Sequence, residues 1–323
     1  MEVQNMLKSQ HYLFMESLVR RIHEDDSEAS LFYEEFYRMQ AGLSGEIKLK
    51  YTLADHHFEE DYCILYNFES LNEFGFSHQI DALLITQQFI LIIEVKQISG
   101  HLYYKPSVHE FSRRKDNDCE ENLPNPFDQA YRHQLFIEHL LQKHHIHIPT
   151  LHLVVIANYR AKLDSSLEMM PIIHLSGLPT FIKNLFANYP ATSYSLVKIQ
   201  QIFQQMIQPL PARRQIEASR LKTGIFCNNC DTKMHMLFHY GVWHCNQCKA
   251  KSKDALLSAL HDYRILISPC ISNHAFRSFT GIPSVFAASR ILSQLNLQAI
   301  GDNKGRSYII PEDILWNNMG DCK

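Results

Sequence analysis

The sequence contains no apolar run that approaches the length of a membrane span, for which about 20 consecutive apolar residues are needed. Residues 1–21 are polar and amphipathic, without the apolar core and small-residue cleavage site of a secretory signal. Internal repeats and extended low-complexity segments are also missing. The 323 residues, 46% of them hydrophobic, have the composition of ordinary globular domains. These features predict a cytoplasmic protein of two or three domains that does not bind membranes.

A strong net charge of either sign is missing as well. The formal net charge is −3, which by itself does not indicate nucleic-acid binding. Residues 1–210 hold 17 Lys and Arg against 26 Asp and Glu, a balance of −9, whereas residues 211–323 hold 14 against 8, a balance of +6. A basic C-terminal third is expected where a chain meets phosphate, and it is equally compatible with an ordinary solvated surface.

Two short acidic motifs, QID at residues 79–81 and EVK at residues 94–96, lie at the ends of neighbouring apolar runs. Both runs are rich in β-branched residues and Leu, which predicts two strands joined by a tight hairpin. With a two-residue turn, Asp81 faces Glu94 and shares one face of the sheet with Lys96. Opposed carboxylates repel each other, and buried charge must be paired or coordinated. A cation, either Lys96 or a bound metal, is therefore expected there.

The order of predicted helices and strands indicates an α/β fold. Asn125 is the predicted N-cap of a helix with Pro126 at its first position, and the polar residues 107–122 are expected to be irregular. Five regions are predicted: an N-terminal helical segment (1–36), an α/β domain (37–163), a helical connector (164–223), a cysteine-containing module (224–262) and a small C-terminal domain (263–323).

The ordered set of motifs in the α/β region resembles the nuclease-related domain (NERD), which is placed in the PD-(D/E)xK nuclease superfamily alongside restriction endonucleases. The set consists of Gly45-Glu46, Gln79-Ile80-Asp81, Glu94-Val95-Lys96 with Gly100, and Asn125-Pro126-Phe127-Asp128-Gln129. The resemblance covers roughly residues 40–160. It implies a restriction-endonuclease-like mixed sheet flanked by helices.

The resemblance also implies a site that hydrolyses phosphodiester bonds. Mg²⁺ or Mn²⁺ suits this chemistry, because it neutralises charge on a phosphoryl oxygen and activates water, and it prefers one or two carboxylates. Asp81 and Glu94 would hold this metal, and Lys96 would position water or stabilise the transition state. Glu46 would orient groups or bind a second metal. Gln129, in the first turn of a helix whose positive end favours phosphate, would contact substrate or water.

Other interpretations of these residues remain open. Asp81 and Lys96 are also compatible with a structural ion pair, with Glu94 solvated at a strand end. A nuclease fold that keeps its carboxylates without turnover is a third possibility. The sequence departs from the family pattern at one position: relatives often carry Gln and Tyr four residues apart on this helix, whereas His133 follows Gln129 here and the nearby Tyr131 lies two residues on.

The cysteine usage indicates metal binding or free thiols, because disulfides are rare in the cytosol. Two C-x2-C motifs, separated by fourteen residues, can close a tetrahedral Zn²⁺ site of the zinc-ribbon type. The expected zinc ligands are Cys227, Cys230, Cys245 and Cys248. The alternatives are a redox C-x2-C motif, or a histidine in place of one cysteine. The segment between the motifs is predicted to form a hairpin.

The C-terminal region shows the pattern helix, short Gly-containing turn, helix. Ser272 is the predicted N-cap of the first helix, and Gly281 the turn. Residues 298–310 contain turn-forming residues and could form a wing hairpin, so a winged-helix-like domain is predicted. A small helical docking domain is the alternative. The candidates for phosphate contact, together with the basic run that begins at Arg113, are Arg113, Arg114, Lys115, Arg290, Lys304 and Arg306.

Together these features predict a Mg²⁺-dependent nuclease that acts on nucleic acid, with DNA favoured, and a zinc-containing C-terminal part that grips it. A non-catalytic DNA-binding or regulatory protein on a nuclease-like scaffold is the second hypothesis, and a docking adaptor the third. DNA against RNA, endonuclease against exonuclease activity, and protein partners are left open.

Overall fold

The computed structural model describes residues 8–116, 118–230, 234–239, 241–302 and 305–315. The chain divides into two compact units: the first comprises residues 1–10 and 37–211, and the second residues 11–36 and 212–323. Helix α3 contributes to both units, since it runs without interruption across residue 36. No helix within the described ranges is both long enough and apolar enough to cross a membrane.

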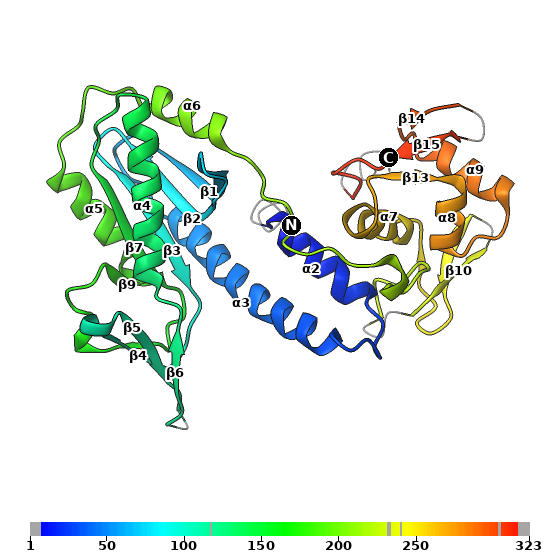
Figure 1. Ribbon diagram of the computed structural model, residues 1–323, viewed down its shortest axis with the longest axis horizontal. Coiled ribbons are helices and arrows are strands. Elements are labelled where there is room, and N and C mark those ends of the chain that lie inside the picture. Colours follow the sequence, from blue (N-terminus) through cyan, green and yellow to red (C-terminus); the bar gives the residue numbers. More distant parts are fainter. Residues whose placement is uncertain (1–7, 117, 231–233, 240, 303–304, 316–323) are drawn as a thin grey trace. The chain divides into compact units, whose positions relative to one another are not determined.

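The first unit is built around a mixed five-stranded sheet with helices on both faces (Figure 1). Its strand order is β1-β2-β3-β7-β9, in which β1, β2 and β3 are antiparallel and β3, β7 and β9 are parallel. The strands are β1 (Tyr62–Leu71), β2 (Ser77–Thr86), β3 (Ile90–Lys96), β7 (Thr150–Ile156) and β9 (Ile172–His174). The predicted α/β fold with a mixed sheet flanked by helices is confirmed.

Two apolar layers enclose this sheet. One joins it to α3 (Ala29–Ala54) and α5 (Leu178–Asn188), and the other joins it to α4 (Pro126–Lys143) and α6 (Leu196–Met206). The central strands are buried on both faces, as continuous apolar runs require. The sequence predicts a helical connector over residues 164–223, and in the structure β9, α5 and α6 from this stretch pack within the first unit.

Helix α3 joins two stretches that the sequence predicts as separate helices, the end of the N-terminal helical segment (1–36) and a second helix over residues 45–56. Gly45 explains why this helix can approach the sheet closely. A Cβ atom at Gly45 would lie 3.2 Å from Val95 Cγ1 and 3.2 Å from Gln97 Cβ, which is tighter than ordinary packing allows. The absence of a side chain at residue 45 thus brings the next residue, Glu46, to the end of β3.

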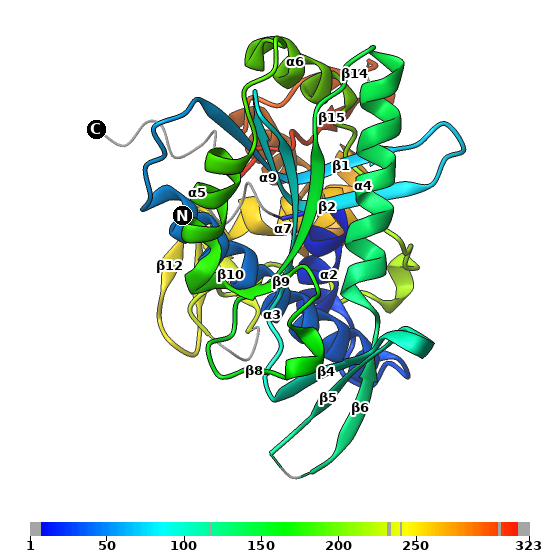
Figure 2. The ribbon, with the colours of Figure 1, turned by 90° about the vertical axis from the view of Figure 1, so that its left-hand side faces the viewer.

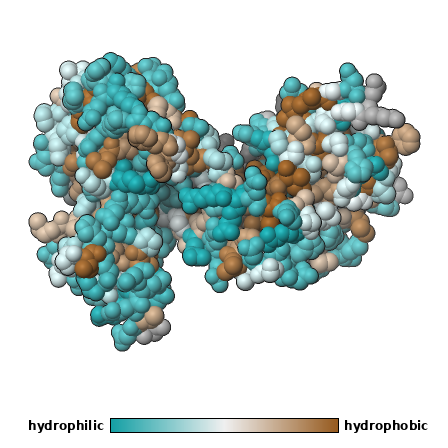
Figure 3. All heavy atoms as spheres, viewed as in Figure 1, coloured by the Kyte–Doolittle hydropathy of each residue, from teal (hydrophilic) through white to brown (hydrophobic). Residues whose placement is uncertain are grey.

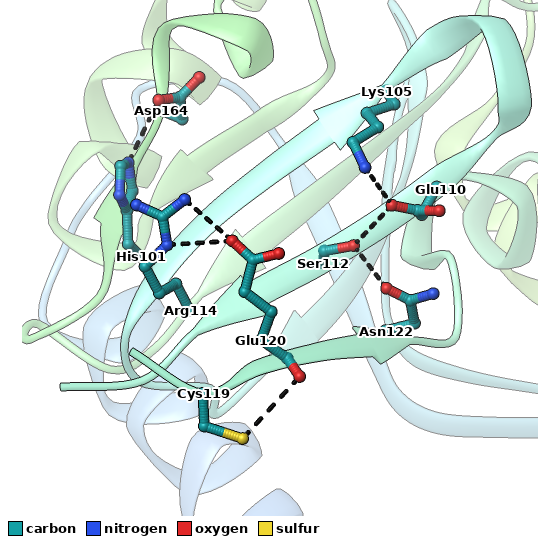
Figure 4. Close-up of polar contacts among 9 residues, drawn as sticks. All are labelled: His101, Lys105, Glu110, Ser112, Arg114, Cys119, Glu120, Asn122 and Asp164. Atoms are coloured by element: carbon teal, nitrogen blue, oxygen red, sulfur yellow. Dashed lines mark hydrogen bonds and ion pairs between the residues drawn. The ribbon is translucent and has the colours of Figure 1, made fainter. Parts of the chain in front are cut away.

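A second, smaller sheet of the first unit has the order β6-β5-β4-β8. Its strands are β4 (His101–Lys105), β5 (Glu110–Arg114), β6 (Glu120–Leu123) and β8 (Lys162–Leu163). The prediction that residues 107–122 are irregular is therefore wrong. It failed because β5 and β6 have few apolar residues, and charged pairs accompany the backbone ladder between them (Figure 4). The visible surface over this sheet is mainly hydrophilic (Figure 3, lower left).

The second unit combines α2 (Gln10–Arg21) and the start of α3 with the C-terminal third of the chain. One apolar core joins the cysteine-containing hairpin to the C-terminal helices. The remaining elements are β10 (Met236–His239), β11 (Val242–Cys245), β12 (Lys251–Ser252), α7 (Ala255–Leu266), β13 (Cys270–Ser272), α8 (Asn273–Thr280), α9 (Val285–Gln294), β14 (Ala299–Ile300) and β15 (Ser307–Ile309).

The predicted helix pair and hairpin of the C-terminal region are present. The Ser272 side chain caps α8 by accepting from the Ala275 amide, and Gly281 ends this helix in the left-handed conformation, with φ of 76°. Ser284 caps α9. Strands β14 and β15 pair antiparallel, and β13 extends them to a three-stranded sheet with the order β13-β15-β14.

Candidate functional site

The register predicted for the β2–β3 hairpin is confirmed over four pairs, from Ile85–Ile90 to Ala82–Ile93. One further step would place Asp81 opposite Glu94, but the ladder ends before this pair. A side-chain hydrogen bond replaces the next main-chain ladder bond: Asp81 Oδ2 accepts from the backbone N–H of Val95 at 2.7 Å. The two strands therefore separate at the predicted carboxylates.

The ladder between β2 and its other neighbour, β1, is also interrupted at this point. The β1–β2 register passes from Tyr66–Ala82 to Phe68–Ile80 without a pair between them, and Asn67 has a positive φ of 48°. The register expected from the two-residue turn would also pair Gln79 with Lys96, but the ladder ends before that pair. The Gln79 amide instead donates to Asn67 Oδ1 at 3.0 Å. Asp81 thus lies at a gap in both ladders, where its side chain can turn toward β3.

Lys96 joins β3 to α4 through two oxygen atoms. Its Nζ donates to Glu94 Oε1 at 2.6 Å and to Gln129 Oε1 at 3.1 Å. Burial lowers the pKa of Lys96, but the neighbouring Glu94 and Asp81 carboxylates outweigh this effect and hold the pKa above its ordinary value. Lys96 is therefore charged at neutral pH.

Glu94 is only 2% exposed. Burial and the Asp81 charge raise its pKa to about 8, and the bond to Lys96 offsets this only in part. Its second oxygen, Oε2, is buried and has no hydrogen-bond partner among the described residues. An unpartnered buried carboxylate oxygen is costly, so this atom indicates that a further cationic or donor group belongs at the site.

Glu46 on α3 belongs to the same electrostatic cluster. Its burial and the charges of Asp81 and Glu94 raise its pKa to about 8. Burial also raises the pKa of Asp81, against the opposing effects of Lys96 and the Val95 amide. Three carboxylates thus share one field with Lys96. They do not form a compact set of metal ligands, since the only such group within the described ranges is the cysteine cluster.

Gln129 owes its position to the start of α4. Asn125 caps this helix as predicted, its side chain accepting from the Phe127 amide at 2.9 Å, and Pro126 is the first helical residue. Gln129 follows in the first turn, where the helix dipole favours negative ligands. The structure therefore brings together all five residues predicted for the catalytic site: Glu46, Asp81, Glu94, Lys96 and Gln129.

A buried histidine pair lies beside α4 and was missed by the sequence analysis, apart from the departure noted at His133. His78 Nδ1 and His133 Nδ1 are 3.1 Å apart, and the His78 ring stacks on Phe136. Burial lowers the pKa of His78 to about 4 and that of His133 to about 3. Both rings are therefore neutral at pH 7. No sequence pattern indicates this pair, because packing between β2 and α4 creates it.

The basic run on β5 is matched by acidic residues on β6. Arg113 Nη2 lies 2.6 Å from Glu121, Lys115 Nζ lies 2.9 Å from the same carboxylate, and Arg114 binds Glu120 (Figure 4). Hydrogen bonds from Arg113 and Lys115 lower the pKa of Glu121 to about 2. These three cations thus have acidic partners within the same sheet, and their contact with phosphate stays a prediction.

The four predicted zinc ligands converge in the second unit. Their sulfur atoms all lie within 4.8 Å of one another. The Sγ atoms of Cys227 and Cys248 are 3.6 Å apart, and those of Cys230 and Cys245 are 3.7 Å apart. A tetrahedron with Zn–S bonds of about 2.3 Å has edges of about 3.8 Å, whereas a disulfide would need about 2.05 Å. The cluster can therefore hold one tetrahedral metal ion.

The remaining predicted contacts to nucleic acid lie in the C-terminal region. Arg290 is exposed on α9. Arg306, also exposed, lies over the Tyr308 ring at 5.9 Å. Lys304 lies outside the described residues.

Comparisons with known proteins relate the α/β domain of the first unit to a known family. Residues 41–157 match the model of the nuclease-related domain family. An uncharacterized protein of Bacillus anthracis is 28% identical over 105 residues, which are 32% of this chain and 47% of the relative. The chain thus spans about half the length of the curated relative it matches. No solved structure shows a significant match. The chain carries a nuclease-related domain, NERD, as its sequence motifs indicate.

Proposed function

We propose that this chain is a metal-dependent nuclease that hydrolyses phosphodiester bonds of DNA. The observation that carries the proposal is the convergence of Asp81, Glu94 and Lys96 at the end of β3, with Glu94 Oε2 buried and unpartnered among the described residues. The match of residues 41–157 to the nuclease-related domain supports it.

The residues present fit a divalent cation. Asp81 and Glu94 meet beside Lys96, and burial together with the charges of neighbouring carboxylates raises the pKa values of Glu46 and Glu94 to about 8. Mg²⁺ or Mn²⁺ prefers one or two carboxylates completed by water, and Asp81 and Glu94 would hold it. When bound, such an ion supplies Lewis-acid stabilisation of the phosphoryl group and lowers the pKa of a bound water.

The protein groups around this position have separate tasks. The Lys96 ammonium, fixed between Glu94 and Gln129, provides a positive charge that can stabilise charge developing on a phosphoryl oxygen. Gln129 holds Lys96 from the α4 side. The positive end of the α4 dipole also favours a phosphate at the start of this helix. Glu46 lies in the field of both other carboxylates and would orient the attacking water.

A cleavage assay tests this function. Purified protein is incubated with single-stranded DNA, double-stranded DNA and RNA, in Mg²⁺, in Mn²⁺ and in EDTA. We expect cleavage that requires metal and that is lost in the Glu94→Ala and Lys96→Ala variants. Glu168→Ala, at an exposed position of the same unit, is the matched control and should retain activity. Absence of metal-dependent cleavage on every substrate would reject the proposal.

One observation favours a second function, namely a non-catalytic DNA-binding or regulatory protein. The Lys96–Glu94 pair, at 2.6 Å, already neutralises one carboxylate without any metal. The same assay separates the two functions, because a non-catalytic protein binds DNA and leaves it intact in both metals.

The second unit would bind the DNA, and a structural metal ion would stabilise its fold. The spacing of the four sulfur atoms supports Zn²⁺ in the cysteine cluster, and a closed site of four cysteine thiolates is structural. The α8–α9 pair and the β14–β15 hairpin support a role in gripping DNA through Arg290 and Arg306. Charge reversal at these two arginines should weaken DNA binding and reduce its salt dependence. Unchanged affinity and salt dependence would reject this role.

A further inference from the structure

Two phenylalanines at the tip of the β1–β2 hairpin are strongly exposed. Phe74 is 77% exposed and Phe76 is 66% exposed. The hairpin extends beyond α4 (Figure 2, cyan, at right). Two large aromatic side chains exposed so close together in the sequence are unusual on a surface that has no binding partner.

The tip is held in a defined conformation. Asn72 Oδ1 accepts hydrogen bonds from the amides of Phe74 and Phe76, at 3.0 and 2.9 Å. The backbone N–H of Asn72 donates to the Phe76 carbonyl, and Gly75, with φ of 80°, completes the turn. The aromatic side chains are thus presented by an ordered loop. An ordered loop loses little conformational entropy when it binds a ligand.

Contacts with α4 anchor the hairpin on both sides of this tip. Before it, the Glu73 carboxylate binds His139 Nε2 at 3.1 Å and Lys143 Nζ at 2.8 Å. After it, Arg132 Nη1 donates to the Ser77 carbonyl at 3.2 Å. The negative charge of Glu73 is therefore matched by α4 and does not oppose an approaching phosphate.

Arg132 also connects the tip to the carboxylate site. It is exposed, and it follows Gln129, the partner of Lys96, by three residues on α4. At 1.5 Å per helical residue, His139 beside the tip lies about 15 Å along α4 from Gln129. Stacked nucleotides rise about 3.4 Å each, so about four nucleotides cover that distance. The Arg132 guanidinium can contact a phosphate, and the exposed Phe74 and Phe76 rings can stack on the bases that follow it in a strand.

We propose that Phe74 and Phe76 are a stacking surface for unpaired bases, and that Arg132 contacts the intervening phosphate. The substrate class is single-stranded nucleic acid, or a single-stranded end, led along α4 toward Glu94 and Lys96. This inference rests on the proposed nuclease function for the direction of the strand. Unpaired bases are required because the faces of bases inside a duplex already stack on their neighbours, whereas every unpaired base offers a face to an aromatic ring.

Binding measurements in EDTA test this surface without cleavage. Fluorescence anisotropy is recorded with labelled single-stranded DNA, single-stranded RNA and duplex DNA, each about 12 nucleotides long to match the site sizes of stacking surfaces. We expect the full chain to bind single strands more tightly than duplex. The Phe74→Ala/Phe76→Ala variant should lose roughly 10- to 100-fold of single-strand affinity, and Phe74→Tyr/Phe76→Tyr should retain it. The DNA and RNA arms identify which strand the surface prefers.

The controls separate stacking from unfolding and from the nuclease proposal. Tyr51→Ala removes another exposed aromatic residue, on α3, and should not change affinity. Thermal unfolding of all variants should match that of the parent protein. Arg132→Gln should reduce the salt slope of single-strand binding by about 0.7. Single-strand affinity that survives Phe74→Ala/Phe76→Ala would overturn the inference. Phe-dependent binding by a protein that cleaves no substrate would reject the nuclease and leave the surface standing.

Discussion

The Asp81 carboxylate accepts a hydrogen bond from the backbone N–H of Val95, with 2.7 Å between Oδ2 and the nitrogen. This bond takes the place of a main-chain ladder bond at the point where β2 and β3 separate. It fixes Asp81 relative to the two side chains that flank Val95 in the sequence, Glu94 and Lys96. The separation of the strands also allows charged groups at the end of an otherwise apolar hairpin to face a ligand.

The Asp81→Asn variant separates the structural task of this side chain from its charge. The amide oxygen of the substituted side chain can still accept from Val95, so the fold should persist with a similar unfolding temperature. The charge that would hold the metal is lost, which removes several kcal/mol of stabilisation of the reacting group and should lower the cleavage rate by at least about 100-fold. The measurement is the single-turnover rate in saturating Mg²⁺. A variant that cleaves at the parent rate would contradict the metal role of Asp81.

Metal binding should also be visible without substrate. A cation that binds only the folded state stabilises it by about 2.7 kcal/mol at about 100 times its dissociation constant. We therefore expect Mg²⁺ or Mn²⁺ to raise the unfolding temperature of the protein, and to raise that of the Glu94→Gln variant much less. Differential scanning fluorimetry with and without EDTA measures this. The Glu168→Ala control excludes binding at the exposed surface. Equal shifts in the parent and the Glu94→Gln variant would place the metal elsewhere.

The sequence predicts the β2–β3 register and the start of α4, because their determinants are local. A short turn and a period of two residues define the strand register, and the Asn125–Pro126 cap determines where α4 begins. Partners distant in the sequence are not predictable in this way. Arg21 and Asp262 are 241 residues apart, and His78 and His133 are 55 residues apart. Strands β5 and β6 were missed for a related reason, because their backbone ladder and the pairing of arginines with Glu120 and Glu121 form only when the two strands meet, and single-strand patterns do not show pairing.

The His78–His133 pair should make stability sensitive to acid. Burial lowers the pKa values to about 4 and about 3, whereas in the unfolded chain they are about 6.5. Below pH 6.5 the unfolded state therefore binds more protons than the folded state, and stability falls as the pH falls toward about 4. Each histidine should account for roughly 2 kcal/mol between about pH 7 and pH 5.

Comparison with a His78→Leu/His133→Leu variant isolates this effect. The comparison is needed because Glu46 and Glu94 have the opposite effect on stability. Their pKa values are raised from 4.5 to about 8, so between these two values the folded state binds more protons than the unfolded state. Their contribution to stability therefore rises as the pH falls. Urea unfolding at about pH 7 and about pH 5 should show a smaller acid loss in the variant. Identical losses in both proteins would contradict the assignment of neutral buried histidines.

Zinc removal should destabilise the second unit. Cys227 and Cys245 are 5% and 2% exposed and belong to the same apolar core as Trp243 and Leu260, so loss of the metal would leave four thiols in contact at the edge of that core. Apparent binding energies of structural zinc reach about 10–16 kcal/mol in small fingers. We expect one zinc per chain by elemental analysis, and none in Cys245→Ser. Cys119→Ser, at an exposed position in the first unit, should keep its zinc. A full zinc content in Cys245→Ser would contradict the predicted ligand set.

The most buried ion pair of the second unit, among the described residues, joins α2 to α7. Arg21 Nε donates to Asp262 Oδ2 at 2.8 Å, and these residues are 1% and 0% exposed. The Arg21 guanidinium also donates to the Gly224 carbonyl and lies between the rings of Phe226 and Phe279, at 4.4 and 4.7 Å from their centres. Arg21 therefore ties the N-terminal helix to the segment that precedes the first cysteine motif.

Removing Asp262 should cost about 3–5 kcal/mol, because it leaves the buried Arg21 charge uncompensated. Removing Arg21 should cost less, because Asp262 Oδ1 also accepts from Arg20 Nη1 at 2.8 Å. Asp262→Ala should show this loss in urea unfolding, whereas Asp254→Ala, an exposed position at the start of the same helix, should change stability by less than about 0.5 kcal/mol. Arg21→Lys keeps the charge but lacks the planar fork and its stacking, so it should also be destabilising. The double variant Arg21→Met/Asp262→Leu should be more stable than Asp262→Ala, since it removes both charges together. A double variant that is less stable than Asp262→Ala would show that the contacts of Arg21 with Gly224 and the two rings outweigh its pairing with Asp262.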